Sequence, residues 1–226
     1  MIIQGGQYDL SNTFINYQFI SSQIISQHEG IHRQLIASTF DGISQIIIDK
    51  AIKFYSNNSE LSNEYKKLLI HIINESRFAH EVFATYLSVK LNDVSETNRL
   101  LAEHPAEYRK YYWYIEDSFG SNLKTSYVQY SVLHCIAALT LSSNFITRLI
   151  ENNLDPNLKL LESEKTNVRL EKIVKVFKND DTFLERVREL VFNKIKNQKL
   201  DPFDITSEED WERANGDSKK LAELVM

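Results

Sequence analysis

Apolar side chains recur at helical spacing along most of this chain, which predicts a mainly helical fold. In the N-terminal part, apolar positions three or four residues apart predict a helix over about residues 12–37. The segment 38–42 interrupts that pattern, and Asp41 can cap a further helix that ends near residue 55. The apolar positions of the first helix are Ile15, Phe19, Ile20, Ile24, Ile25, Ile31 and Leu35.

Four further segments lie outside this region. Residues 60–92 have the spacing of one long helix, and residues 123–151 that of a strongly apolar helix. Residues 105–118 combine aromatic and charged side chains, which suits either the lining of a substrate cleft or a packed amphipathic helix. Residues 1–10 are a short segment that contains glycine. We expect either a strand there or a loop that covers the functional site of the protein. With only 6 glycines and 3 prolines in 226 residues, long helices are favoured over hairpins.

The C-terminal part is more highly charged. Charged amphipathic helices are predicted over about 158–178 and 181–198, and an acidic helix near 207–225. Their charges are mixed in sign, as on a solvated surface, and these helices could also dock a protein partner. The fold expected is mainly α with at most a small β element. It comprises a functional domain over 1–153 and a helical extension, or a further part of the same domain, over 154–226.

Composition narrows the function classes. An apolar content of 42% and a charged content of 25% are those of an ordinary soluble globular protein. The net charge is −5 and no basic block occurs, so nucleic acid is not expected as a partner. No apolar run approaches a membrane span, and the N-terminus lacks the pattern of a secretory signal. The lone cysteine, Cys135, cannot form an internal disulfide, so a cytoplasmic location is expected.

The most informative motif is His28-Glu29-Gly30-Ile31-His32, an H-E-x-x-H sequence inside the first predicted helix. Histidines four residues apart lie one turn apart on the same helix face, so both imidazoles can reach one metal ion. Zinc (Zn2+) suits neutral imidazole nitrogen and keeps a position open for catalysis. Glu29 lies beside that metal, where it can take a proton from a bound water. The motif therefore predicts a zinc-dependent hydrolase, and among hydrolases a peptidase.

Such a site needs a third protein ligand. The extended motif H-E-x-x-H-x-x-G-x-x-H requires a glycine and a histidine where this chain has Leu35 and Ser38. A glutamate of the 60–92 helix is the other main option, and the candidates are Glu75 and Glu81. Because these two residues are six positions apart, they point to different helix faces. By amphipathic pattern alone, Glu75 could be the buried carboxylate and Glu81 a solvated charge.

A family resemblance bears on this choice. Residues 81–86, with the sequence E-V-F-A-T-Y, resemble the E-G-[FL]-A-x-Y segment of gluzincin metallopeptidases. Together with the H-E-x-x-H sequence, this segment is similar to the compact bacterial members called minigluzincins. The likeness covers two short segments, about residues 24–42 and 75–90. Val82 stands where that family usually has glycine, a residue that allows close backbone approach.

The resemblance implies a zincin-like helical core with assigned roles. His28, His32 and Glu81 become the three zinc ligands. Glu29 becomes the general base that accepts a proton from water. Glu75 becomes an acceptor for a ligand histidine, and it stays open as the alternative third ligand. The implied substrate is a peptide or a protein.

Hydrolysis of this kind also needs a hydrogen-bond donor for the oxyanion. Tyrosine and histidine are the donor types of gluzincin-like sites, and Tyr127, Tyr130 and His134 share one face of a predicted helix. We take Tyr130 and His134 as the catalytic candidates; the alternative is that they are core residues with satisfied polar tips. The remaining internal histidines are expected on the surface or on helix faces, and they are His71, His80 and His104.

Three function classes remain open. The first is a zinc-dependent metallopeptidase. The second is a zinc-binding protein without proteolytic activity, which low β content favours because such peptidases commonly hold an extended substrate along a sheet edge. The third is a helical interaction protein in which the motif is accidental. Bound zinc distinguishes the third class from the others, and activity that is lost in Glu29→Gln distinguishes the first from the second.

Overall fold

The computed structural model describes residues 6–8, 13–15, 23–90, 92, 96–119 and 127–180, with isolated positions at 182, 186, 189 and 193. Within this part of the chain the fold is mainly helical with one two-stranded sheet, which confirms the mainly α prediction. The elements are β1 (Gly6–Tyr8), β2 (Thr13–Ile15), α1 (Gln23–Ser38), α2 (Phe40–Phe54), α3 (Ser59–Lys90), α4 (Thr97–Glu103), α5 (Tyr108–Phe119), α6 (Tyr127–Thr140), α7 (Phe145–Glu151), the short 3-10 helix η3 (Glu162–Glu164) and α8 (Thr166–Asn179).

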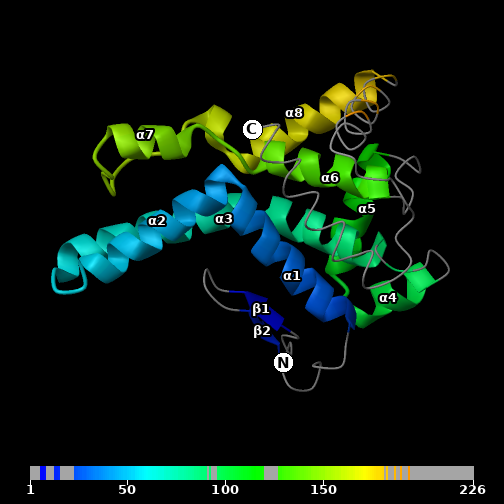
Figure 1. Ribbon diagram of the computed structural model, residues 1–226, viewed down its shortest axis with the longest axis horizontal. Coiled ribbons are helices and arrows are strands. Elements are labelled where there is room, and N and C mark those ends of the chain that lie inside the picture. The colour runs from blue at the N-terminus through cyan, green and yellow to red at the C-terminus, as the bar shows by residue number, and fades with distance from the viewer. Residues whose placement is uncertain are drawn as a thin grey trace.

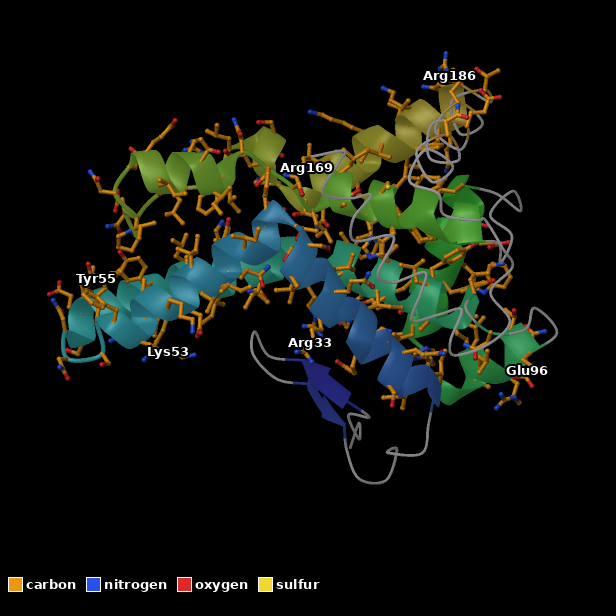
Figure 2. The ribbon with its side chains drawn as sticks, in the orientation of Figure 1. Arg33, Lys53, Tyr55, Glu96, Arg169 and Arg186 are labelled. Atoms are coloured by element: carbon orange, nitrogen blue, oxygen red, sulfur yellow. The ribbon has the colours of Figure 1, made fainter. Side chains whose placement is uncertain are left out.

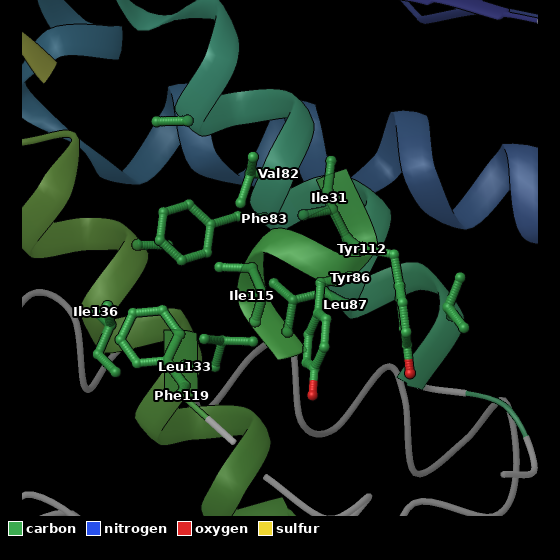
Figure 3. Packing of buried hydrophobic residues seen from close by; sticks show 14 of the residues in the cluster. Ile31, Val82, Phe83, Tyr86, Leu87, Tyr112, Ile115, Phe119, Leu133 and Ile136 are labelled. Carbon is green, nitrogen blue, oxygen red and sulfur yellow. The ribbon is translucent and has the colours of Figure 1, made fainter. Parts of the chain in front are cut away.

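Helix α3 is the centre of the fold. Its 32 residues span about 48 Å, and it contacts α1, α2, α5, α6 and α8. The C-terminal half of α3 lies in the main hydrophobic core, where side chains from α1, α5 and α6 pack against it (Figure 3). The α3 members of this core are Ala79, Val82, Phe83, Ala84, Tyr86, Leu87 and Val89. The long helix predicted over 60–92 is therefore confirmed with nearly its predicted bounds.

The N-terminal half of α3 belongs to an arm that also contains α2 and α7. This arm extends to one side of the molecule in Figure 1. A second apolar cluster fills it, with the buried members Ile48, Ala51, Tyr65, Leu68, Ile72, Phe145 and Leu149. The hydroxyl group of Tyr65 also donates a hydrogen bond to the Leu154 carbonyl at 2.8 Å. The arm thus has apolar packing of its own, separate from the core around the C-terminal half of α3.

A tight turn joins α1 to α2. Thr39 is the N-cap of α2, and its side chain accepts a hydrogen bond from the Gly42 amide at 3.2 Å. A Cβ at Gly42 would lie 2.1 Å from the carbonyl oxygen of Ile36, so the two helices approach too closely for a side chain there. The prediction that Asp41 caps α2 is wrong, because the Asp41 carboxylate is buried in a tertiary network.

This network joins three helices. The Asp41 carboxylate accepts hydrogen bonds from the Ser143 amide at 3.0 Å and from the Thr166 hydroxyl at 3.1 Å. It also pairs with Arg169 at 3.0 Å. Arg169 lies where α6 and α8 meet (Figure 2), and its Nε atom donates to the Thr140 carbonyl at 2.9 Å. The start of α2 is therefore tied to the end of α6 and to α8.

The N-terminal bound predicted for the first helix is wrong. Residues 13–15 form β2, which pairs antiparallel with β1 so that Ile15 lies opposite Gly6. A Thr-Phe-Ile run has strand propensity, which the spacing of apolar positions does not register. The sheet packs beside α1 (Figure 1). It also agrees with the strand that was one of two expectations for residues 1–10.

Two other predicted helices are divided or shortened. The apolar helix predicted over 123–151 becomes α6 and α7, because Ser143 binds Asp41 between them. The helix predicted from residue 158 begins instead at Thr166, where α8 follows η3. In the first case a polar contact made by the folded chain overrides the local apolar pattern.

Helix α8 packs on α3, α5 and α6, and Leu170, Val174 and Phe177 join the main core. The helices predicted over 181–198 and 207–225 lie outside the described residues, apart from the isolated positions in the first of them. The division of the chain into two domains stays a prediction. Among the described residues, Val132–Glu151 is apolar and long enough to cross a membrane, but most of it is buried inside the protein, as in a core helix.

Candidate metal centre

Helix α1 places the two histidines of the H-E-x-x-H motif together. The Nε2 atoms of His28 and His32 lie 3.0 Å apart, and the two rings meet edge to face. Both side chains are largely withdrawn from solvent, with exposed fractions of 6% and 12%. The predicted helical setting of the motif is therefore confirmed, and the two imidazoles point at a common position.

Helix α3 brings Glu81 to the same position. Its Oε2 atom lies 3.4 Å from Nε2 of His28 and 3.5 Å from Nε2 of His32. The neighbouring residue Val82 is fully buried in the core between the helices. A valine at the position of the family's glycine therefore serves packing here, and it leaves the Glu81 carboxylate directed at α1.

These distances can be tested against the geometry of a bound ion. Ligand atoms about 2.1 Å from a tetrahedral zinc lie about 3.4 Å from one another. The three separations in this protein, 3.0, 3.4 and 3.5 Å, agree with that value. The Oε2 atom of Glu81 is buried and has no hydrogen-bond partner of good geometry. The spacing of these donor atoms thus suits a shared metal ion better than hydrogen bonds among the three side chains, which are those of His28, His32 and Glu81.

The protonation states favour metal binding. Burial lowers the pKa of His28, and this effect outweighs the neighbouring Glu81 carboxylate, which would raise it. The imidazole is therefore neutral, which is the form that binds a metal. Burial acts to raise the pKa of Glu81, but the imidazoles of His28 and His32 beside it hold it well below its usual value. The third donor is therefore an ionised carboxylate.

Glu29 lies beside this group with only 7% of its surface exposed. The pKa of Glu29 is raised to about 7, chiefly by burial; His32 opposes this rise and the charge of Glu81 adds to it. A carboxyl group with a pKa near neutrality can both accept and release a proton. The position of Glu29 thus suits the general base that the motif predicts.

The competing carboxylate, Glu75, is not part of this group. It is half-buried on α3 and adds to the raised pKa of Lys165, an effect that comes mainly from Glu162. This places Glu75 on the side of α3 that faces Lys165. The described ligand atoms that lie within 4.8 Å of one another belong to His28, His32 and Glu81.

The structure adds two histidines that the sequence placed elsewhere. His80 and His104 are both buried, with 6% of the surface of each exposed, so the surface or helix-face prediction for these two is wrong. The His80 ring lies 5.9 Å from that of His32, and the His104 ring lies 5.3 Å from that of His28. Burial lowers the pKa of each to about 3. His71 is exposed, as predicted.

A tyrosine also reaches the group. The ring of Tyr108 lies 5.3 Å from that of His28, and burial together with the charge of Glu81 raises the pKa of its hydroxyl group. Tyr108 belongs to the aromatic segment 105–118, for which a substrate cleft was one of two expectations. The aromatic segment therefore indicated in the sequence that some of its rings could lie at the site. An aromatic helix alone does not reveal which of its rings reaches another helix.

The structure gives less information on the predicted oxyanion donors. Tyr127 and Tyr130 lie in α6, and their side chains are outside those that the structure describes. His134 is fully buried in α6, and burial lowers its pKa to about 4. The catalytic role of Tyr130 and His134 stays a prediction.

Comparison with family models, curated proteins and solved structures finds no match for this chain. The resemblance to gluzincins therefore rests on the two short segments that contain His28–His32 and Glu81. The geometry of the group carries the argument for function independently of that resemblance.

Proposed function

We propose that this protein is a zinc-dependent metallopeptidase. The observation that carries the proposal is the convergence of His28, His32 and Glu81, whose three donor atoms lie 3.0 to 3.5 Å apart. Two neutral imidazoles and one carboxylate are a ligand set used by catalytic zinc sites, where a fourth position stays open. The match of donor type and spacing supports zinc in preference to Mg2+ or Ca2+, which bind mainly oxygen.

The residues around the group have roles that follow from their positions. Zinc held by these three atoms would lower the pKa of a coordinated water to about 7 and would polarise the scissile carbonyl group. Glu29 would accept a proton from the attacking water and pass it to the leaving amine, for which a pKa near neutrality is well matched. His28 stays neutral, and Glu81 keeps the negative charge at the centre.

A peptide substrate is supported by the sheet beside α1. Strands β1 and β2 pair with each other and, within the described residues, with no third strand. An extended peptide binds such a sheet by adding a strand to a free edge. This sheet packs against α1, the helix that carries Glu29, so a peptide on its edge would lie beside that helix.

Metal content and proteolysis together test the proposal. Purified wild-type protein should hold zinc near one equivalent and should cleave a denatured protein substrate. Glu29→Gln should keep the zinc and lose activity by about 10²- to 10⁴-fold, the usual contribution of a general base. His32→Ala should lose both. Glu60→Gln, at an exposed glutamate in the first turn of α3, is the matched control.

Each failure has a distinct meaning. Zinc in the wild type without activity on any denatured substrate would leave a metal protein that serves regulation or partner binding. A wild type that takes up no zinc from a zinc-containing buffer would make the H-E-x-x-H sequence accidental. Activity that survives Glu29→Gln would remove this residue from the mechanism.

A further inference from the structure

Two buried histidines beside the candidate metal group have ring nitrogens without a hydrogen-bond partner among the described residues. They are His104, at Nε2, and His80, at both nitrogens. Each residue exposes only 6% of its surface. A buried polar atom without a partner is unfavourable in a folded protein, and it commonly marks the place of an ion, a water molecule or a ligand. The metal group therefore has polar neighbours that can bind something in addition to an ion.

His104 lies on the flank of the group that includes His28. Its ring is 5.3 Å from that of His28, and it stacks almost parallel on the ring of Tyr108, at 5.4 Å and 8°. Among the described residues, the ligand atoms that lie within 4.8 Å of one another come from His28, His32 and Glu81 and not from His104. His104 is therefore a neighbour of the ligands rather than a fourth ligand, and the stacking on Tyr108 fixes the plane of its ring.

The flank that carries His104 borders on solvent. His104 lies in the connection between α4 and α5, where residues 105–107 are exposed and Tyr108 is half-buried. His80 has different surroundings, because it lies within α3 directly after the fully buried Ala79, with its ring 5.9 Å from that of His32. A residue that contacts a substrate has to lie where the substrate can enter, and this condition favours His104.

We infer that His104 is a further catalytic residue of the proposed peptidase, whose imidazole donates a hydrogen bond from Nε2 to the oxygen of the scissile carbonyl group. Nε2 carries the proton in one of the two neutral forms of the ring. A donor at this oxygen contributes most as negative charge develops there during hydrolysis. The inference rests on the proposed function. It assigns to the α4–α5 connection the role for which the sequence suggested Tyr130 and His134 in α6.

Substitutions at His104 test the inference in the full-length, zinc-loaded protein. His104→Phe keeps a flat ring on Tyr108 but has no donor, so kcat on a denatured protein substrate should fall by about 10²- to 10³-fold, the usual effect of removing one such donor. KM should change little, because the contact is strongest in the transition state. His104→Gln supplies an amide N–H and should recover part of the loss. His71→Gln, at an exposed histidine of α3, is the matched control.

Three measurements without turnover distinguish this role from a structural one. The zinc content of His104→Phe should equal that of the wild type, since His104 is not a ligand. Its free energy of unfolding in urea should be equal or higher, because the substitution removes a buried nitrogen without a partner. Acetohydroxamate, a small molecule that binds zinc through its oxygens, should bind zinc-loaded His104→Phe about tenfold more weakly by calorimetry, as expected for the loss of one hydrogen bond.

The outcomes separate this inference from the proposed function. A wild type without bound Zn2+ or without proteolysis overturns both. An active wild type with an unchanged kcat in His104→Phe overturns only the role of His104. A loss of zinc or of folding stability in His104→Phe would show that the ring serves the structure, and it also overturns the catalytic role. The same holds for a fall in kcat in His80→Phe that is absent in His104→Phe, because the contact would then lie on the other flank.

Discussion

The Oε2 atom of Glu81 lies 3.5 Å from the Nε2 atom of His32, although the two residues belong to different helices. Their backbones are held by apolar neighbours on the same helices: Ile31 and Leu35 on α1 and Val82 and Phe83 on α3 are fully buried in one core. The donor atoms are therefore brought together by packing before any ion binds. Such preorganisation is what a tight metal site requires.

The first prediction concerns the identity of the third ligand. Glu81→Gln replaces a charged donor with a weak one and should reduce the zinc content of the purified protein to a trace. Glu75→Gln should leave the zinc content unchanged, because Glu75 lies on the side of α3 that faces Lys165. Elemental analysis of both variants, purified side by side, makes the measurement. A loss of zinc in Glu75→Gln instead would exchange the roles of the two carboxylates.

The second prediction concerns two helical glycines. A Cβ added at Gly30 would meet nothing within 4 Å, so Gly30→Ala should raise the free energy of unfolding by about 0.5–1 kcal/mol through helix propensity. Gly42→Ala should lower it by about 1–3 kcal/mol, because the new methyl group collides with the Ile36 carbonyl. Urea denaturation gives both values. Equal effects at the two positions would contradict the close approach at Gly42.

The third prediction concerns the buried pair of Asp41 and Arg169. Asp41→Ala leaves a largely buried guanidinium without its carboxylate and should cost about 3–5 kcal/mol of folding stability. The control is Asp49→Ala, which removes the more exposed pair of Asp49 with Lys53 and should cost no more than about 1 kcal/mol. The two variants are compared by denaturant titration. A cost for Asp41→Ala as small as that of the control would show that the network contributes little.

The fourth prediction concerns acid sensitivity. Burial lowers the pKa of His134 to about 4 from its ordinary 6.5, so the unfolded chain takes up a proton that the folded protein excludes. This contribution to stability is fully present above pH 6.5 and is lost as the pH falls towards 4. The loss is on the order of 3 kcal/mol for one histidine.

His134→Gln tests this, because the variant lacks the titrating group and should lose less stability than the wild type between pH 7 and pH 4.5. His71→Gln changes an exposed histidine and serves as the control. His80 and His104 are buried in every variant and contribute equally to each, so the difference belongs to His134. Parallel stability curves for the wild type and His134→Gln over this range would refute the prediction.

The local spacing of apolar and polar residues was sufficient to predict several parts of the molecule. The helical period of the apolar positions predicted α2 and α3 nearly in full, because each helix buries one face against its neighbours. The same period predicted that His28 and His32 share a face of α1, since residues four apart on a helix always do. These features depend on neighbours within about one turn, and the sequence states them directly.

Other parts of the structure could not be predicted from local spacing, because they depend on contacts between segments that are distant in the sequence. The single helix predicted over 123–151 divides because Ser143 bonds to Asp41, a partner that no local window contains. His80 and His104 looked like surface residues because an isolated histidine is polar; only the packing of α3 and of the α4–α5 connection against α1 buries them.

The sequence by itself determined the two halves of the candidate centre: a helix with two facing histidines and a glutamate, and a second helix with two competing carboxylates. Tertiary structure decided which carboxylate reaches the histidines and which tyrosine ring packs against His28. The physical reason is that helix geometry fixes directions within one helix, whereas the rotation of one helix against another is set by the side chains packed between them.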